Sequence, residues 1–522
     1  MNAARDLYRL DLLRPVSRRD MIGGLSAGLV TIATRSASAA SNEQIVLQPN
    51  WRRDHFRVRM EMDVQGNVNV TGDPLAPSSA HSSSAKQQLP IEAQAQLDFE
   101  ERFLRPADAE PSSPVVATQR HYAEAVGIST LNKTKRTVTL RDDAIQVISR
   151  REILPETIYS GDTFLTQDEL DLLQTPIASV ALDHLMPAEP MRRGDEVTID
   201  STTVASVFNL TGVPASDVMM KLVDFDASVA KLQLRGTVDG SVRGVPTRQR
   251  LVGKLTFDRR AATVTWAAVA IHETREVGKT EPGFDITAKI QLIRKPLDAC
   301  RSLPESPAEI DFDQPAPESR LFKAIGSDRV QAAALLDRRW HLLQDQPGEA
   351  ILRMVDTDAT IAQCNLRPLA KLKPGEQLTL EAFQKDCRRT LDRQASEVIQ
   401  AEESLSETGL RVLKVTATGQ VQGIPIQWIM MHFSDDTGPR LLATITMDNA
   451  SVPKLDGSDV QLAATMTFTK PGQSDVDKPQ EKVTEVASRR LKSSSDTAGT
   501  SHRGSGQTSD VRSASDLGSR KR

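Results

Sequence analysis

The residues best suited to chemistry in this 522-residue chain are three cysteines, eight histidines and several adjacent acids. Cys300, Cys364 and Cys387 permit at most one disulfide, and the Cys364–Cys387 pairing stays open in an oxidising compartment. Cys387 falls on the apolar stripe of an expected helix, which favours an inert, packed thiol over a nucleophile. The chain beyond residue 40 contains no Gly-x-Ser-x-Gly motif for a serine nucleophile.

The histidines and acids do not form a known catalytic pattern. His272-Glu273-Thr274-Arg275-Glu276 lacks the second histidine of a zinc-protease helix and lies in a strand pattern. His432 precedes Asp435-Asp436, but the composition of residues 435–438 predicts a hairpin turn. Glu100-Glu101 and Asp142-Asp143 are interpreted as solvated charge, because glycosidase acids must face each other across a cleft. We therefore expect no catalytic, cofactor-binding or metal-binding residues.

Composition narrows the classes of partner. The formal net charge is −4 and the isoelectric point is about 6.1. The chain as a whole is therefore not basic, and we expect no nucleic-acid partner. The length predicts two or three domains with sizeable cores.

Residues 1–40 have the order of an export signal. Arg18 and Arg19 precede a short apolar run, and Ala39 and Ala40 end a small-residue cleavage site. The arginine pair is typical of twin-arginine export, although Met21-Ile22 departs from its usual pattern, so general secretion stays open. The apolar run is shorter than the roughly 20 residues of a membrane span, which leaves an uncleaved anchor as the alternative to cleavage. We expect an extracytoplasmic protein in the periplasm, envelope or medium, with no transmembrane span in the mature chain.

Residues 41–300 read as an antiparallel β-rich domain. Apolar and charged residues alternate over residues 55–64 and 91–100, which predicts strands with one buried face. Gln65-Gly66-Asn67 predicts a turn after the first strand, and residues 73–88 read as a disordered Ser/Pro/Ala-rich insert. Further alternating or apolar runs predict strands at residues 119–129, 135–140, 144–150, 230–238, 251–257, 264–272 and 286–293.

Helices interrupt these strands. Thr166-Gln167-Asp168-Glu169 is a capping-box pattern ahead of a helix that Pro176 interrupts and Pro187 ends, and residues 202–210 predict a second short helix. Strands around one or two packed helices indicate a large curved antiparallel sheet, with a two-sheet sandwich as the alternative.

A proline-rich linker at residues 301–318 separates this part from a second domain at residues 319–470, and a disordered tail follows at 471–522. Thr379 is the expected N-cap of a helix whose apolar stripe is Leu380, Phe383, Cys387 and Leu391. We expect this stripe to pack on a sheet that contains residues 340–343, 410–415 and 426–431. The predicted fold class is α+β.

The two parts share one short pattern. Residues 240–246 and 419–425 match at their Gly, Val, Gly and Pro positions, and strand patterns flank both. Shared strand–turn chemistry explains the match, with a true internal repeat as the alternative.

Two resemblances follow from particular motifs. Residues 340–468 resemble the PsbP-like α/β sandwich through Trp340, the Pro347-Gly348 turn, Ala362-Gln363-Cys364, the helix with Phe383, and residues 419–428 with the 436–438 hairpin. That fold implies a non-catalytic binding or assembly module. Over most of its length the chain also resembles uncharacterised secreted proteins of planctomycete-type bacteria, in which motifs like Leu97-Asp98-Phe99-Glu100-Glu101-Arg102 precede such a domain. The first part is loosely similar to the half-open barrels of envelope lipoprotein carriers.

The leading hypothesis is a non-enzymatic secreted or envelope protein that binds a protein or polymer partner. The alternatives are a carrier of an apolar, lipid-type ligand and a secreted hydrolase. A carrier needs a cavity walled by the apolar faces of residues 58–62 and 93–99, whereas a binding module fills that space with side chains.

Overall fold

The computed structural model describes residues 43–70, 87–278, 282–356, 359–373, 376–435 and 438–469. The chain divides into two compact units, Met1–Gln44 and Ile45–Arg522. Of the first unit only Glu43 and Gln44 are described. Everything below concerns the second unit.

Three predictions fall wholly or largely outside the described residues. They are the export signal with Arg18, Arg19, Ala39 and Ala40, most of the insert at residues 73–88, and the tail at 471–522. The last two residues of the insert, Gln87 and Gln88, belong to a strand.

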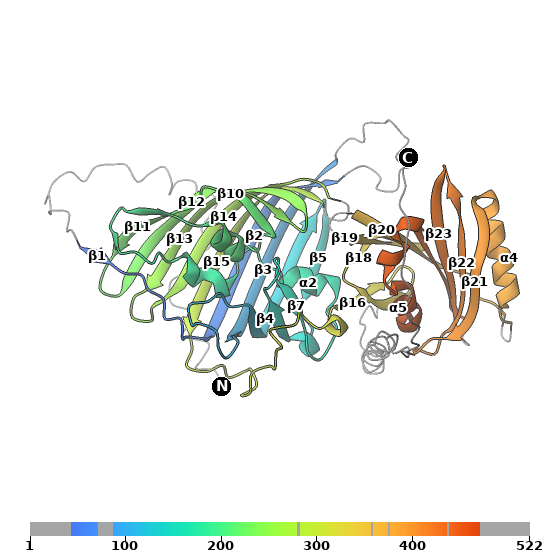
Figure 1. Cartoon of the computed structure of the whole chain (residues 1–522), viewed down its shortest axis with the longest axis horizontal. Helices are drawn as coiled ribbons and strands as arrows, with labels where there is room; N and C mark the ends of the chain where they lie inside the picture. Colours follow the sequence, from blue (N-terminus) through green and yellow to red (C-terminus); the bar gives the residue numbers. More distant parts are fainter. Residues whose placement is uncertain are drawn as a thin grey trace, which may run out of the picture. The chain divides into compact units, whose positions relative to one another are not determined.

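The largest element is a thirteen-stranded sheet in which every strand pair is antiparallel (Figure 1). Its main path runs β7-β6-β4-β3-β2-β15-β14-β13-β12-β11-β9, while β5 pairs with β4 and β10 pairs with β12. The strands are β2 (His55–Val70), β3 (Gln87–Leu104), β4 (Ala117–Leu131), β5 (Thr134–Thr139), β6 (Gln146–Arg150), β7 (Thr157–Tyr159), β9 (Glu196–Thr198), β10 (Gly212–Ser216), β11 (Met219–Phe225), β12 (Val229–Val242), β13 (Val245–Asp258), β14 (Thr263–Arg275) and β15 (Gly283–Pro296). The short strands β1 (Gln44–Ile45) and β8 (Met191–Arg192) lie outside this path.

The predicted turn at Gln65-Gly66-Asn67 is wrong, because β2 continues straight through it to Val70. Gly66 lies opposite Ile286 of β15. A Cβ atom at Gly66 would lie 2.2 Å from the backbone oxygen of Asp285, so the neighbouring strand comes too close for any side chain. The glycine therefore marks a close backbone approach inside a long strand rather than a chain reversal.

Short helices lie between β7 and β11. They are α2 (Gln167–Leu173), the 3₁₀ segment η2 (Ser179–Leu185) and α3 (Ser201–Val207). The predicted capping box is confirmed: Thr166 accepts a hydrogen bond from the Glu169 amide, and the Glu169 side chain accepts one from the Thr166 amide. The predicted continuation beyond Pro176 is a tighter 3₁₀ helix rather than an α-helix. A further 3₁₀ turn, η1 (Asp142–Ala144), precedes β6.

The remaining strands form two antiparallel sheets. A seven-stranded sheet has the order β18-β19-β20-β24-β23-β22-β21, and a three-stranded sheet has the order β16-β17-β25. The strands are β16 (Phe322–Ser327), β17 (Ala332–Asp337), β18 (Trp340–Gln346), β19 (Glu349–Asp356), β20 (Ala359–Pro368), β21 (Ala395–Leu405), β22 (Arg411–Val421), β23 (Ile424–Ser434), β24 (Arg440–Asp448) and β25 (Thr467–Phe468). The helices are α4 (Leu380–Leu391), α5 (Ser458–Thr465) and the 3₁₀ segments η3 (Glu318–Arg320), η4 (Asp392–Gln394) and η5 (Asn449–Leu455).

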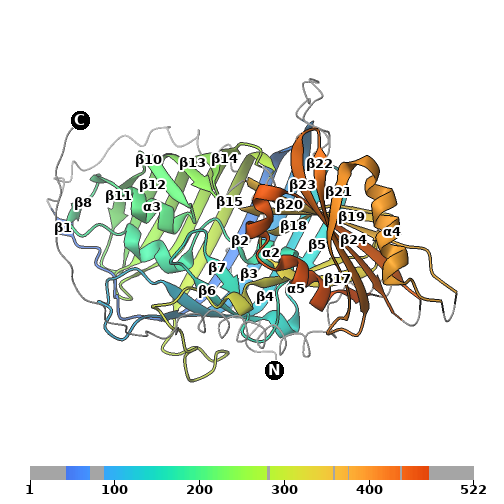
Figure 2. The same cartoon turned by 45° about the vertical axis from the view of Figure 1, so that its right-hand side comes forward.

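Helix α4 confirms the predicted cap and bounds, and Figure 2 shows it on the opposite side of the seven-stranded sheet from α5. Phe383, Cys387 and Leu391 are buried, while Leu380 is only half-buried. The stripe packs on alternate residues of β22 and β23, among them Leu413, Val415, Trp428 and Met430. The sheet beneath α4 contains β18, β22 and β23, as predicted, and Trp340 of β18 packs on its other face, with Ile429 and Met431. Alternation along each strand sends neighbouring residues into two separate cores.

The shared Gly/Pro pattern is explained by two equivalent hairpins. Arg243 and Gly244 link β12 to β13, and Gln422 and Gly423 link β22 to β23, all four with positive φ. Two central residues with positive φ define the type I′ turn, whose twist matches that of antiparallel strands.

The predicted α+β class, with a PsbP-like α/β sandwich at residues 319–470, is wrong. Strands account for 54% of the structure and helices for 14%. The sheets on both sides of residue 300 are large and antiparallel, so the protein is a mostly-β protein. One strongly periodic helix, α4, suggested more helix than the second part contains.

Residues 301–318, predicted as a linker, lie against the thirteen-stranded sheet. The Glu100 carboxylate accepts hydrogen bonds from the amides of Arg301 and Ser302, at 2.7 and 2.8 Å. Arg150 donates to the Gln314 carbonyl at 2.9 Å, so side chains of the sheet hold both ends of this segment.

Candidate functional site

The inner face of the thirteen-stranded sheet is the place where a carrier would need a cavity. Val58 and Met60 of β2 and Leu97 and Phe99 of β3 are at most 2% exposed there. The side chains that cover them come from the helical region between β7 and β11, which shares one continuous apolar cluster with the sheet. Its contributors include Leu165, Leu170, Leu173, Ile177, Val180, Leu182, Leu185, Val204 and Val207. Side chains therefore fill this inner face.

A charged network is buried beside this apolar cluster. Arg120 on β4 donates from Nε to Glu101 at 2.8 Å, and from Nη1 and Nη2 to both oxygens of Glu156 at 3.1 and 3.2 Å. Arg151 donates to Glu156 at 3.1 Å, and the Ser149 hydroxyl donates to the same carboxylate at 2.6 Å. Two guanidinium groups thus face two carboxylates, and the network has no net charge.

The surroundings shift the titration of this network. Burial by itself would raise the pKa of Glu156, but the charges of Arg120 and Arg151 and the hydrogen bonds from Arg120 and Ser149 lower this pKa to about 2. Burial raises the pKa of the adjacent Tyr122 to about 12. Glu156 is therefore ionised and saturated with donors, which is the opposite of what a general acid needs at neutral pH.

A second buried network ties the η2 segment to the sheet. Arg294 on β15 donates to the Ser179 carbonyl at 2.7 Å and to the Thr263 hydroxyl at 2.5 Å, and it pairs with Asp183. The Asp183 carboxylate also accepts the Val264 amide at 2.8 Å. In addition, the Ser179 hydroxyl donates to Glu101 at 2.7 Å, so both networks meet at η2. Charged hydrogen bonds fix this segment in place.

The structure corrects one interpretation of the acids and supports another. Glu100 and Glu101, predicted to be solvated, are 7% and 0% exposed. Glu101 binds Arg120, whereas Glu100 accepts backbone amides, so the two adjacent acids have different partners. Asp142 and Asp143 are exposed, as predicted.

The cysteines are buried free thiols. Burial raises the pKa of Cys364 and of Cys387 to about 12 and that of Cys300 to about 11. Cys364 and Cys387 pack in different apolar clusters, on opposite faces of the seven-stranded sheet, and are not paired. A thiol with a raised pKa is a poor nucleophile.

The two histidines considered as ligands lie in different settings. His272 is exposed and contacts Asp285 at 3.0 Å. His432 is fully buried and accepts a hydrogen bond from Arg440 at 2.9 Å, and burial lowers its pKa to about 4. Among the described residues, no group of three His, Cys, Asp or Glu side chains is arranged to hold a metal ion.

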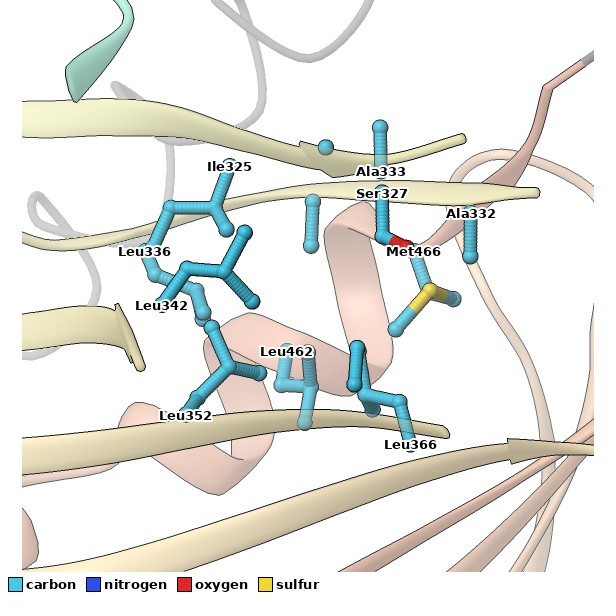
Figure 3. A pocket seen from close by; sticks show the side chains of 13 residues that line it. Ile325, Ser327, Ala332, Ala333, Leu336, Leu342, Leu352, Leu366, Leu462 and Met466 are labelled. Atoms are coloured by element: carbon cyan, nitrogen blue, oxygen red, sulfur yellow. The ribbon is translucent and has the colours of Figure 1, made fainter. Parts of the chain in front are cut away.

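A small apolar cavity lies between the three-stranded sheet, β18–β20 and α5. Figure 3 shows Leu336, Leu342, Leu352 and Leu462 around it, with Met466 close by. The cavity volume is about 10 Å³. A cavity of that size holds about one water molecule, and its apolar walls disfavour even that. It is far too small for an acyl chain.

Lys323 on β16 is the most unusual single ionisable group. It is 1% exposed, and its Nζ donates to Gln167 of α2 at 2.5 Å and to the Arg338 carbonyl at 3.0 Å. Burial, only partly offset by Asp171, lowers the pKa of Lys323 to about 7. The backbone continues this contact, since the Ala324 amide donates to the Leu165 carbonyl at 3.1 Å. Lys323 thus lies where α2 meets the three-stranded sheet.

The comparisons with known proteins add little. No family model matches the chain, and no curated protein matches it. A protein of unknown function from Pseudomonas aeruginosa, described as a putative regulator, is 13% identical, with 27% of this chain and 92% of that chain covered and a TM-score of 0.19. A Bacteroides thetaiotaomicron protein is 11% identical, with 27% and 46% covered and a TM-score of 0.20. Salmonella typhi OmpF is 8% identical, with 78% and 99% covered and a TM-score of 0.12. TM-scores this low support no inference about this chain.

Sequence reasoning missed the buried networks, although the signal was present. Continuing the alternation of β3 past Phe99 places Glu101 on the inner face. Continuing that of β15 past Leu292 likewise places Arg294 there. A charge at an inward position of an otherwise apolar face predicts a buried partner, but the partner's identity depends on the fold.

Proposed function

We propose that this protein is a non-enzymatic binding or assembly module of the cell envelope. The observation that carries the proposal is the filled inner face of the thirteen-stranded sheet. Val58, Met60, Leu97 and Phe99, the residues that would wall a carrier's cavity, are packed against side chains of the same chain. What the large sheet offers to a partner is its outer face.

The η2 segment packs on this inner face, and buried hydrogen bonds attach it to the sheet, which argues against its acting as a lid. Opening the inner face would separate Arg294 from Asp183 and Ser179 from Glu101. Opening would exchange these buried hydrogen bonds for hydrogen bonds to water. Opening would also expose Leu182 and Leu185, which are buried in the apolar cluster, and that cost is met before an apolar ligand gains any contact.

The location in the envelope rests on the sequence. Arg18 and Arg19 precede an apolar run and a small-residue site at Ala39 and Ala40, in the order of an export signal. Among the described residues, no helix is long and apolar enough to cross a membrane. The partner we envisage is a protein, a polymer or the membrane surface.

The test is a measurement of bound lipid. The full chain is purified without detergent and washed in high salt, which removes surface-bound charged lipid, and its organic extract is quantified by mass spectrometry. We expect far less than one lipid per chain. One lipid per chain would establish the carrier and overturn the proposal.

Two variants test whether an apolar probe would report a cavity if the protein contained one. Leu182→Ala opens space in the filled inner face, and Leu462→Ala opens space at the small cavity near α5. We expect each variant to bind an apolar fluorescent probe more than the wild type does. A wild-type protein that already binds the probe stoichiometrically would also contradict the proposal.

A further inference from the structure

The outer face of β12–β15 combines cations with exposed apolar side chains. The exposed residues of β13 alternate strictly with buried ones and include Arg250, Val252 and Lys254. Directly paired residues of antiparallel strands lie on the same face. Lys231 of β12 therefore shares this face, because it pairs with Thr256, the next outward residue of β13.

Apolar side chains lie between these cations. Val252 is 50% exposed and pairs with Ala270 of β14, and Lys254 pairs with Ala268. The next row holds Trp266 of β14, half-buried, opposite Ile293 of β15, which is 45% exposed. We call this surface, defined by Lys231, Arg250, Val252, Lys254, Trp266 and Ile293, the basic outer face. Strand spacings make it roughly 15 Å by 20 Å.

The cations of this surface form no direct ion pairs with other described residues. Within the part of the chain that the structure describes, no carboxylate lies within ion-pair distance of Lys231, Arg250 or Lys254. Of the acids around the surface, Asp224 lies directly opposite Lys231 on β11 and pairs with Arg193, Asp239 pairs with Arg248, and Asp285 contacts His272. Asp226 lies near enough to Lys231 for the lysine charge to contribute to lowering the pKa of Asp226. The six residues that define the basic outer face carry three positive charges and no negative one, although the chain as a whole has a charge of −4.

We propose that the basic outer face docks on the surface of an anionic lipid bilayer. This inference rests on the proposed function and names the partner of the binding module. Lys231, Arg250 and Lys254 face the phosphate groups, and Val252, Ile293 and the Trp266 ring enter the boundary between headgroups and acyl chains. Tryptophan prefers that boundary because its ring is apolar and its N–H is polar.

The mixture of side chains favours a bilayer over a soluble polyanion. Lys231, Arg250 and Lys254 would be attracted electrostatically to an anionic membrane, but a soluble polyanion would attract them equally well. Only a bilayer also gives Val252 and Ile293 an apolar place to go, since exposed aliphatic side chains gain nothing beside a hydrated polymer.

The test compares vesicles of phosphatidylcholine mixed with phosphatidylglycerol with vesicles of phosphatidylcholine alone, using the full chain in a sedimentation assay. Each basic residue contributes roughly fivefold to partitioning, so Arg250→Gln with Lys254→Gln should weaken binding to the anionic vesicles about thirtyfold. Raising the salt from about 0.1 M to about 1 M shortens the Debye length from ~10 Å to ~3 Å and should abolish most binding.

The matched control is Lys385→Gln with Lys454→Gln, which removes the same charge from exposed positions outside the thirteen-stranded sheet. We expect this control to bind like the wild type. Val252→Ser with Ile293→Ser keeps every charge, and it should weaken vesicle binding severalfold while leaving binding to soluble polyphosphate unchanged. Unchanged melting temperatures show that all variants are folded.

Three results would overturn the proposal. They are equal binding of the wild type to both kinds of vesicle, equal losses in the Arg250/Lys254 pair and the Lys385/Lys454 control, and tight binding to polyphosphate without binding to vesicles. The last result would assign the face to a soluble polyanion. None of them changes the lipid content of the salt-washed protein, so failure here is distinct from failure of the proposed function.

Discussion

The buried carboxylate of Glu156 offers the most direct test of what holds the first part of the structure together. Glu156 accepts hydrogen bonds from Arg120, Arg151 and Ser149 and is 1% exposed. Glu156→Gln keeps the shape of the side chain but removes the negative charge. Two guanidinium groups then face a single remaining carboxylate, that of Glu101.

The magnitude follows from the change in pKa. The pKa of Glu156 falls from its usual value of 4.5 to about 2 on folding. A tenfold change in an acid dissociation constant corresponds to about 1.4 kcal/mol, so the ionised carboxylate stabilises the folded state by about 3 kcal/mol. Breaking a buried ion pair by removing one partner costs about 3–5 kcal/mol, which agrees with that value.

The lowered pKa also determines the pH dependence. Because the folded pKa of Glu156 is depressed, its contribution is fully present above pH 4.5 and is lost as the pH falls through 4.5 towards 2. Glutamine does not titrate. The difference in unfolding free energy between wild type and Glu156→Gln should therefore be largest at pH 7 and should shrink towards zero near pH 2.

The assay is urea unfolding of both proteins at several pH values, followed by circular dichroism. Ser149→Ala removes one hydrogen bond from the same carboxylate and should cost only about 2 kcal/mol. Glu196→Gln removes an exposed carboxylate paired with Lys221 and should leave the midpoint nearly unchanged. A Glu156→Gln protein as stable as wild type at pH 7 would refute the reasoning. A penalty independent of pH would assign it to packing instead of charge.

Three further predictions concern other parts of the chain. Phe383→Ala should lower the unfolding free energy by about 3–5 kcal/mol, because the ring is 4% exposed in the core beneath α4. Cys387→Ser should lower the melting temperature, because it places a hydroxyl in the same apolar cluster. Unchanged melting temperatures in both variants would mean that this face of α4 is not part of a core. Lys323→Met should raise the melting temperature more at pH 6 than at pH 10. Burial lowers the pKa of Lys323 to about 7, so the buried ammonium destabilises the folded state fully below pH 7, and this effect fades as the pH rises towards 10.5. An equal rise at both pH values would contradict this reasoning. Replacing Arg18 and Arg19 with Lys should abolish export of a reporter fusion if the twin-arginine route is used, and unchanged export would assign the chain to general secretion.

Several features followed from the sequence alone because they depend on neighbours along the chain. Alternation predicted the strands around residues 55–64 and 91–100, and the capping box at Thr166 and the cap at Thr379 predicted the starts of α2 and α4. The matched Gly and Pro positions predicted two equivalent turns, which the structure shows as type I′ hairpins. Periodicity, caps and turns are local, so a single sequence contains them.

Tertiary structure alone decided what those elements face. Only the fold places Arg120 beside Glu101 and Glu156, and Arg294 beside Asp183, because these partners are separated by 19 to 111 residues in the chain. The turn predicted at Gly66 was wrong because the reason for that glycine lies on β15. The α+β class was wrong because one strongly periodic helix reveals nothing about how many strands pair elsewhere. The basic outer face likewise exists only once β12–β15 are paired in register, since alternation along each strand determines which residues point outward but not which strands become neighbours.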